Sequence, residues 1–174
     1  MKAHTLYGTS EQPPDGIYPF AALPVRLGFP SRGDFEIIYS AMGKAIAVTA
    51  LREFPRISRI CRASGQLLPY RCQHSRQLAP GIHVYDPRFC GLLRHSCDPN
   101  VFLDMSELWL WALKDIKKGD RLTMDYAATE DQLRRQFACQ CGAYDCRGWI
   151  TGYDEPPNAD GQLFLQHWRR RSLC

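Results

Sequence analysis

"RHSCDPN", residues 94–100, is the stretch that decides the fold of this 174-residue chain. It is polar and contains Pro99 and Asn100, so it predicts a turn that carries one cysteine, Cys97. A second stretch, "CQCGAYDC" at residues 139–146, holds three more cysteines spaced C-x-C-x4-C. Three thiols this close together are typical of metal ligands, and a tetrahedral zinc needs one ligand more.

Spacing alone leaves the fourth zinc ligand open. The candidates are Cys97 and Cys174, with His95 and His167 as weaker alternatives. The chain has eight cysteines, and its N-terminus lacks the apolar region of a signal peptide. We therefore expect an intracellular protein whose thiols stay reduced, and we interpret the clustered cysteines as metal ligands rather than as disulfides.

The composition predicts an ordinary globular domain with one core, because 45% of the residues are hydrophobic and 23% are charged. The most apolar stretch, residues 108–113, is too short to cross a bilayer, so no membrane association is expected. Six arginines and one acid lie between Arg52 and Arg76. We interpret this run as a solvated face, while a patch for an acidic partner such as nucleic acid is the alternative.

The pattern of residues predicts a mainly β chain. Runs of β-branched and aromatic residues predict strands at 35–40, 45–51, 57–61 and 82–85, and on both sides of the polar turn at 117–120. A capping-box pattern from Thr129 to Gln132 predicts a short helix over 130–136. Residues 151–174 contain Pro and Gly, and we interpret them as a C-terminal tail.

Three stretches together resemble the SET-domain family of protein lysine methyltransferases. The family's N-H-S-C-x-P-N appears as residues 94–100, and its G-E-E-L-T-x-D-Y appears as residues 119–126. The C-x-C-x4-C of 139–146 is similar to the post-SET zinc motif. The resemblance covers roughly residues 35–150. It implies a mainly β SET domain of the β-clip type, with short strands, a knot-like crossing of the chain and a zinc-bound post-SET segment.

The resemblance also divides the chain. It implies an irregular N-terminal segment at 1–34, a SET domain at 35–128, a post-SET zinc segment at 129–150 and a C-terminal tail at 151–174. In the family the cysteine of the first motif completes the zinc site. The implied zinc ligands are Cys97, Cys139, Cys141 and Cys146.

Site residues follow from the resemblance, position by position. Tyr126 is the implied catalytic residue, and it lines the substrate channel together with Met124. The methyl donor of the family is S-adenosylmethionine. The residues implied to bind it are Gly43, Lys44, Ala45, Arg94, His95 and Tyr126.

The sequence departs from the family pattern at several of these positions. Arg94 replaces an asparagine, and we hypothesise that its guanidinium meets the carboxylate of the cofactor. Ala63 stands where the family has a second active-site tyrosine. That tyrosine is therefore absent here, unless Tyr70 or Tyr85 takes its role. Met124 replaces a Phe or Tyr, which suggests room for more than one methyl group.

The implied function is a protein-lysine N-methyltransferase that acts on a lysine side chain of a histone or another protein, with zinc as a structural metal. The alternative is a catalytically weak or inactive SET-fold binding module. A zinc-dependent nucleic-acid binder is a third reading, and the arginine run is its only support. We expect a monomer, in either the nucleus or the cytoplasm.

Overall fold

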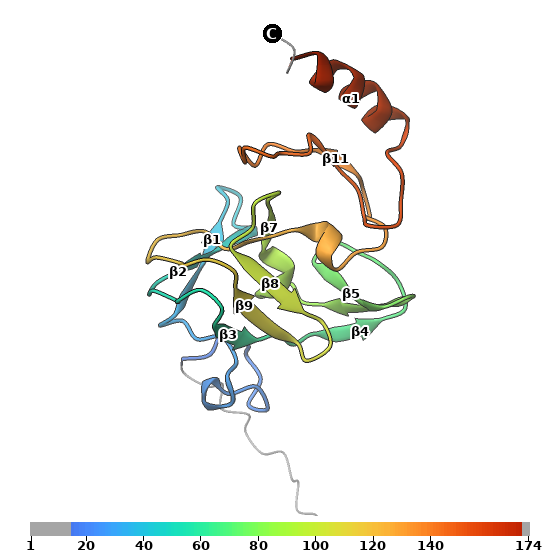
Figure 1. Ribbon diagram of the computed structural model, residues 1–174. Helices are drawn as coiled ribbons and strands as arrows, with labels where there is room; N and C mark the ends of the chain where they lie inside the picture. The colour runs from blue at the N-terminus through green and yellow to red at the C-terminus, as the bar shows by residue number, and fades with distance from the viewer. Residues whose placement is uncertain (1–14, 172–174) are drawn as a thin grey trace, which may run out of the picture.

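The computed structural model describes residues 15–171, and within that range the chain is mainly β (Figure 1). The strands are β1 Phe35–Tyr39, β2 Ala45–Ala50, β3 Arg59–Arg62, β4 Gln66–Leu68, β5 Ser75–Ala79, β6 Ile82–Tyr85, β7 Arg94–His95, β8 Val101–Asp104, β9 Trp109–Ala112, β10 Thr123–Met124, β11 Phe137–Ala138 and β12 Trp149–Ile150. The helices are α1 Ala159–Arg171 and the short 3-10 helices Val25–Leu27, Cys90–Leu92 and Tyr126–Ala128. The mainly β class expected from the sequence is confirmed.

β1 and β2 form an antiparallel hairpin, as their β-branched residues predict. Ile37 lies opposite Val48, and Val48 is completely buried in the core. Gly43 closes the turn with a φ of 72°, a left-handed conformation that favours glycine. The hairpin places the turn residues 40–44 at the edge of the β core.

The two strands expected around the turn at 117–120 both exist, but they do not pair with each other. β9 lies between β3 and β8 in a three-stranded antiparallel sheet. After the turn the chain follows β2, because Leu122 N–H donates to Val48 O at 2.9 Å, and β10 then pairs with β7. β4, β6 and β5 form a second three-stranded sheet.

Segments 94–100 and 121–124 lie side by side, which is the close passage that the knot-like crossing implies. β7 and β10 are parallel, and Ser96 N–H donates to Met124 O at 3.0 Å. The side chain of Asn100 joins the two segments: its Oδ1 accepts from Thr123 N–H at 2.8 Å, and its Nδ2 donates to Arg121 O at 2.9 Å. This contact brings two of the three sequence motifs together.

The predicted helix over 130–136 is wrong. The chain there has no regular structure after the 3-10 helix Tyr126–Ala128. Glu130 is buried and accepts a hydrogen bond from Gln77 N–H at 3.0 Å, while Asp131 N–H donates to Gln77 Oε1 at 3.1 Å. The polar groups that were expected to begin a helix therefore form hydrogen bonds that attach this segment to β5.

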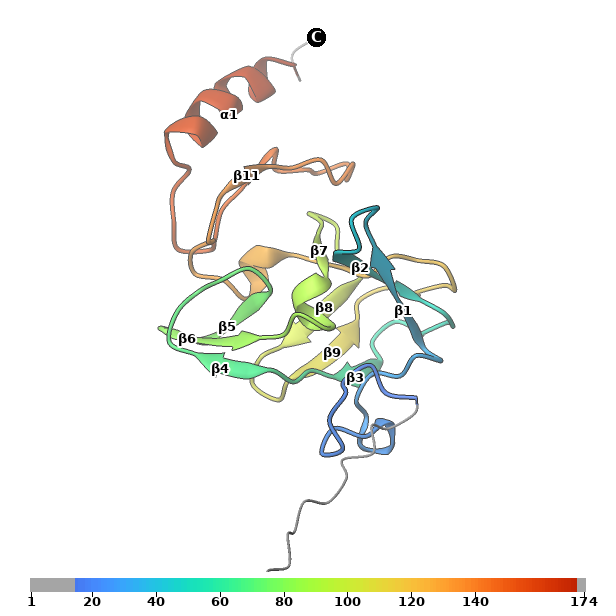
Figure 2. The ribbon, with the colours of Figure 1, turned by 180° about the vertical axis from the view of Figure 1, so that it is seen from behind.

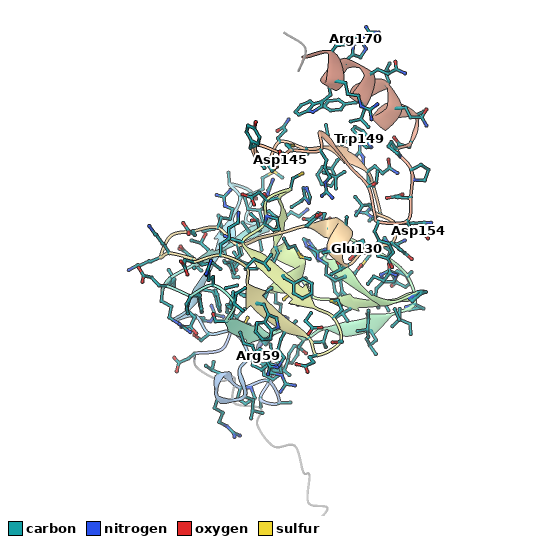
Figure 3. All side chains as sticks on the ribbon, in the orientation of Figure 1. Arg59, Glu130, Asp145, Trp149, Asp154 and Arg170 are labelled. Atoms are coloured by element: carbon teal, nitrogen blue, oxygen red, sulfur yellow. The ribbon has the colours of Figure 1, made fainter. Side chains whose placement is uncertain are left out.

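The C-terminal tail contains a helix, α1, which the sequence analysis did not predict. Asn158 caps α1 by accepting from Gly161 N–H at 2.9 Å. Phe164 stacks between Trp149 and Trp168, and a Cβ on Gly161 would lie 2.3 Å from the indole nitrogen of Trp149. Figures 1 and 2 show the β11 segment and α1 together on one side of the β sheets, and Figure 3 shows Trp149 beneath α1.

Candidate functional site

A cleft of about 850 Å³ lies between the β core and the segment that leads into the cysteine cluster. Its walls come from distant parts of the chain. They are Lys44 and Ile46, residues 71–76, residues 91–96, a set from 121–126 (Arg121, Thr123 and Tyr126), Glu130 and residues 133–141 except Gln136. All three sequence motifs therefore contribute to one cleft.

Tyr126 is held rigidly in this cleft. Its hydroxyl donates to Leu93 O at 2.9 Å. Its ring makes edge contacts with the rings of His95 and Phe137, at centroid distances of 5.2 and 6.1 Å. Because the hydroxyl proton is committed to a backbone carbonyl, the lone pairs of the oxygen remain available to accept a hydrogen bond.

His95 connects Tyr126 with the cysteine cluster. Its Nδ1 accepts from Tyr126 N–H at 3.3 Å, so a neutral ring carries its proton on Nε2, which lies 3.5 Å from Cys97 Sγ. Burial lowers the pKa of His95 to about 4, with Asp125 opposing and Arg147 adding to the shift. The imidazole is therefore neutral near pH 7 and is suited to donate to a thiolate.

The four cysteines implied as metal ligands lie together. Their Sγ atoms are all within 4.8 Å of one another, and the Sγ atoms of Cys97 and Cys139 are 3.9 Å apart. Tetrahedral zinc with Zn–S bonds of about 2.3 Å places its sulfurs about 3.8 Å apart. This donor set fits zinc. Of the other candidates, His95 faces Cys97, His167 is exposed on α1 and outside the cluster, and Cys174 lies outside the described residues.

Backbone N–H groups point at the sulfur atoms of the cluster. Cys97 N–H points at Cys141 Sγ at 3.5 Å, and Arg147 N–H points at Cys97 Sγ at 3.4 Å. Burial opposes ionisation of Cys141, but the backbone N–H groups of Cys97 and Ala143, together with the neighbouring thiols, lower its pKa to about 6. Thiolate is the form that binds zinc.

An ion pair ties the cysteine cluster to the residue that precedes Tyr126. Arg147 Nη2 donates to Asp125 Oδ1 at 2.6 Å. Asp125 also caps the 3-10 helix that begins at Tyr126, since its side chain accepts from Ala127 N–H at 3.1 Å. Asp125, the residue before Tyr126, is therefore in contact with both the 3-10 helix and the segment that carries the cysteines.

The other implied cofactor residues fall into two groups. Lys44, Arg94 and His95 line the cleft, as Tyr126 does. Gly43 and Ala45 are not among the lining residues, and their role in cofactor binding stays a prediction. Ile46 lies in β2, two residues after Lys44, and lines the cleft, but the sequence analysis missed it.

Met124 is 1% exposed and belongs to the hydrophobic core, and it does not line this cleft. Its channel role stays a prediction. Tyr70 and Tyr85 are also absent from the cleft, and Ala63 is buried in the core. Among the described residues, Tyr126 is the one tyrosine that lines the cleft.

The arginine run does not form one solvated face. Arg52, Arg56 and Arg59 are exposed, but Arg71 and Arg76 line the cleft. Arg76 is only 8% exposed, and its guanidinium carbon lies 4.7 Å from the centroid of the Tyr126 ring. Sequence analysis missed Arg76 as a site residue because a charged residue in a basic run gives no sign of burial.

Comparison with protein families identifies the central part of the chain. Residues 45–127 match the family model described as "SET domain". The fold, the crossing and the cysteine cluster agree with this match, so residues 45–127 form a SET domain and the resemblance noted in the sequence is confirmed.

Curated relatives include methyltransferases from several organisms. "Methyltransferase flvH" of Aspergillus flavus is 34% identical over an alignment of 105 residues, with 58% of this chain and 56% of that protein covered. The "Histone-lysine N-methyltransferase, H3 lysine-9 specific" of Schizosaccharomyces pombe is 35% identical over 83 residues, with 33% of this chain and 16% of that protein covered. This chain thus spans about half the length of the first relative and a small part of the second.

Solved structures agree at the level of the fold. KRYPTONITE in complex with mCHG DNA and SAH superposes with a TM-score of 0.53 and 26% identity, over 66% of this chain and 28% of that one. The methyltransferase domain of human SETMAR shares the fold, with a TM-score of 0.50 and 19% identity over 68% of this chain and 58% of that one. Within residues 15–171 no helix is long and apolar enough to cross a membrane.

Proposed function

We propose that this chain is a protein-lysine N-methyltransferase that uses S-adenosylmethionine. The observation that carries the proposal is Tyr126, whose hydroxyl is anchored to Leu93 O inside a cleft walled by all three SET motifs. The names of the relatives support it, since several are histone-lysine N-methyltransferases, and a solved neighbour is a complex with SAH.

The reaction needs little covalent chemistry from the protein. S-adenosylmethionine supplies a methyl group activated by its sulfonium. The lone pair of a neutral amine forms the new N–C bond while the S–C bond breaks and its electron pair stays on sulfur, and the amine proton is lost to solvent. The chain must align the two partners and exclude water.

Tyr126 orients the amine. Its hydroxyl already donates to Leu93 O, so it can accept from an amine N–H and hold the nitrogen lone pair on the methyl carbon. Lys44, Arg94 and His95 line the same cleft and are the proposed contacts of the cofactor. Arg94 is exposed at its rim and is placed to reach a carboxylate.

Zinc bound by Cys97, Cys139, Cys141 and Cys146 would have a structural role. All four protein ligands are sulfurs, which leaves no open position for catalysis at the metal. The metal would fix residues 133–141, which form one wall of the cleft.

The substrate is proposed to be a protein that carries a lysine, either a histone or a non-histone protein. We also propose that the protein is a monomer and acts inside the cell, in the nucleus or the cytoplasm. The proposed domain boundaries follow residues 34, 128 and 150.

The test is cofactor binding followed by methyl transfer. Zinc-loaded wild-type protein is titrated calorimetrically with S-adenosylmethionine, and transfer of labelled methyl is then measured on histone and non-histone proteins. Tyr126→Phe is expected to bind the cofactor but to lose about 100-fold or more in transfer. Tyr153→Phe, an exposed tyrosine outside the cleft, is the matched control.

Well-folded, zinc-replete protein that binds no S-adenosylmethionine would defeat the enzyme proposal. The alternative, an inactive SET-fold binding module, would then be favoured.

A further inference from the structure

Arg76 is a buried cation beside the reactive hydroxyl. Its Nη1 donates to Ser75 O at 2.9 Å and its Nη2 donates to Leu93 O at 3.2 Å. Its Nε has no hydrogen-bond partner. A guanidinium carries five N–H donors, which is more than the two carbonyls use, so Arg76 has unused donors, and the residue is part of the cleft wall.

No carboxylate of the described residues lies within 4.0 Å of Arg76. The acidic groups nearest to the cleft are engaged by Arg71, whose Nη2 is 2.5 Å from Asp131 Oδ1 and whose Nε is 3.7 Å from Glu130 Oε2. A charge that is buried without a counter-ion is costly, and the residues around Arg76 do not provide a counter-ion. An anionic group of a bound ligand would provide it.

The whole cleft has the same charge bias. Seven lining residues are Lys or Arg, and Glu130 is the one acid among the described lining residues. The cationic residues are Lys44, Arg71, Arg76, Arg94, Arg121, Arg134 and Arg135. A cleft with walls of one sign concentrates ligands of the opposite charge and repels a strongly basic peptide.

The position of Arg76 places the anion close to the reacting nitrogen. Arg76 Nη2 and the Tyr126 hydroxyl bind the same carbonyl oxygen, so they are no farther apart than the sum of these two hydrogen-bond lengths. An anion bound by Arg76 therefore lies within a few bonds of an amine bound by Tyr126. The guanidinium also favours the neutral form of that amine, which is the nucleophile.

We propose that Arg76 binds a carboxylate of the substrate, so that the methylated amine carries a carboxylate close to it. This inference rests on the proposed methyltransferase function and deepens it. The carboxylate has two sources, namely a free amino acid or an acidic side chain next to a lysine in a protein. In the transfer, the amine nitrogen gains the methyl, sulfur keeps the S–C electron pair, and the carboxylate is unchanged.

The first measurement separates substrate from cofactor, because S-adenosylmethionine has a carboxylate of its own. Calorimetric titration with S-adenosylmethionine compares wild type with Arg76→Met, Arg76→Lys and the exposed charge control Arg56→Met. All four are expected to bind within about twofold of one another. A loss of about tenfold or more in Arg76→Met alone assigns Arg76 to the cofactor and overturns the proposal.

The second measurement uses labelled methyl transfer to three probes. They are an equimolar mixture of free amino acids, a peptide with Glu on both sides of its lysine, and the same peptide with Arg at those positions. Wild type is expected to favour a carboxylate-bearing probe over the Arg-flanked peptide by about tenfold or more in kcat/KM. Arg76→Met is expected to reduce this ratio about tenfold, and Arg76→Lys to reduce it less.

The probes identify the source of the carboxylate. Transfer to free amino acids indicates a free amino acid as substrate, and transfer to the Glu-flanked peptide indicates an acidic side chain next to a lysine. A preference for the Arg-flanked peptide, or a ratio unchanged in Arg76→Met of normal zinc content and melting temperature, contradicts the proposal. Bound cofactor with no transfer to either carboxylate-bearing probe contradicts it as well. Absence of cofactor binding defeats the proposed function itself, so the two failures are distinct.

Discussion

The β core and the post-SET segment are stabilised in different ways. Val48, Leu110 and Leu122 belong to one apolar cluster and are fully buried. Within 133–150 only Cys139, Gly148 and Ile150 are buried. The core is therefore held by hydrophobic burial, whereas the segment that completes the cleft buries few side chains, and we propose that metal ligation by its cysteines stabilises it.

Removal of zinc should give the largest effect and should confine it to one region. Structural zinc contributes about 10–16 kcal/mol in small zinc-binding domains at neutral pH. After chelation, hydrogen exchange should show lost protection over 133–150, while β2 and β9 remain protected. Cofactor affinity should fall in parallel.

Cys97→Ser is expected to reproduce the effect of chelation. Cys72→Ser, which alters a cysteine of the cleft wall outside the cluster, is the control for hydrogen-exchange protection. Simultaneous loss of protection in β2 and β9 would mean that the two regions fold as one unit.

A cavity in the core should lower the stability of the fold and leave the zinc content unchanged. Leu110→Ala removes a completely buried side chain from β9 and should cost about 2–5 kcal/mol in the free energy of unfolding. Chemical denaturation measures this, and the zinc content of the folded protein should not change. Leu163→Ala, at a residue 58% exposed on α1, should stay within about 0.5 kcal/mol of wild type. If Leu110→Ala lost zinc but kept its free energy of unfolding, the β core and residues 133–150 would not be stabilised separately.

Arg147→Met tests the connection between the two regions. The ion pair with Asp125 is partly exposed, so its loss should cost about 1 kcal/mol or less in stability. Methyl transfer should nevertheless fall roughly tenfold, because Tyr126 follows Asp125 directly and small displacements are costly at a reacting centre. Normal methyl transfer in Arg147→Met would show that Asp125 holds Tyr126 without help from the zinc segment. Lys118→Met, which removes an exposed positive charge elsewhere, is the control for the change in net charge.

The smallest effect is expected for Arg94→Ala. Arg94 is exposed at the cleft, so loss of its contact with the cofactor carboxylate should cost about 1 kcal/mol, or roughly fivefold in affinity. Calorimetric titration with S-adenosylmethionine gives the value, with the exposed Arg59→Ala as the control. Unchanged affinity would remove Arg94 from the proposed cofactor site.

Much of the site could be predicted because short motifs carry it. Thiols at zinc spacing have one common use in a reduced compartment, and residues 94–100 and 119–126 are specific to the family they resemble. The structure brings Cys97 within ligand distance of Cys139, Cys141 and Cys146, and it places Tyr126 and His95 in the same cleft.

Secondary structure was less predictable where tertiary contacts compete with local preference. The capping pattern at Thr129 was present, but Glu130 and Asp131 bind Gln77 instead of forming a helix. α1 had signals of its own in Asn158 and in the absence of proline from Ala159 to Arg171, yet its apolar face needs Trp149 to pack against.

The sequence by itself determined the mainly β class and the three closely spaced thiols, because these depend on residue types in short, regular patterns. The family motifs in the sequence added Cys97 and Tyr126 as candidate site residues. Only the tertiary structure decided that Arg76 is buried against Tyr126, that Met124 belongs to the core and that β10 pairs with β7. Burial and strand pairing depend on which distant segments meet, and the local sequence does not record that.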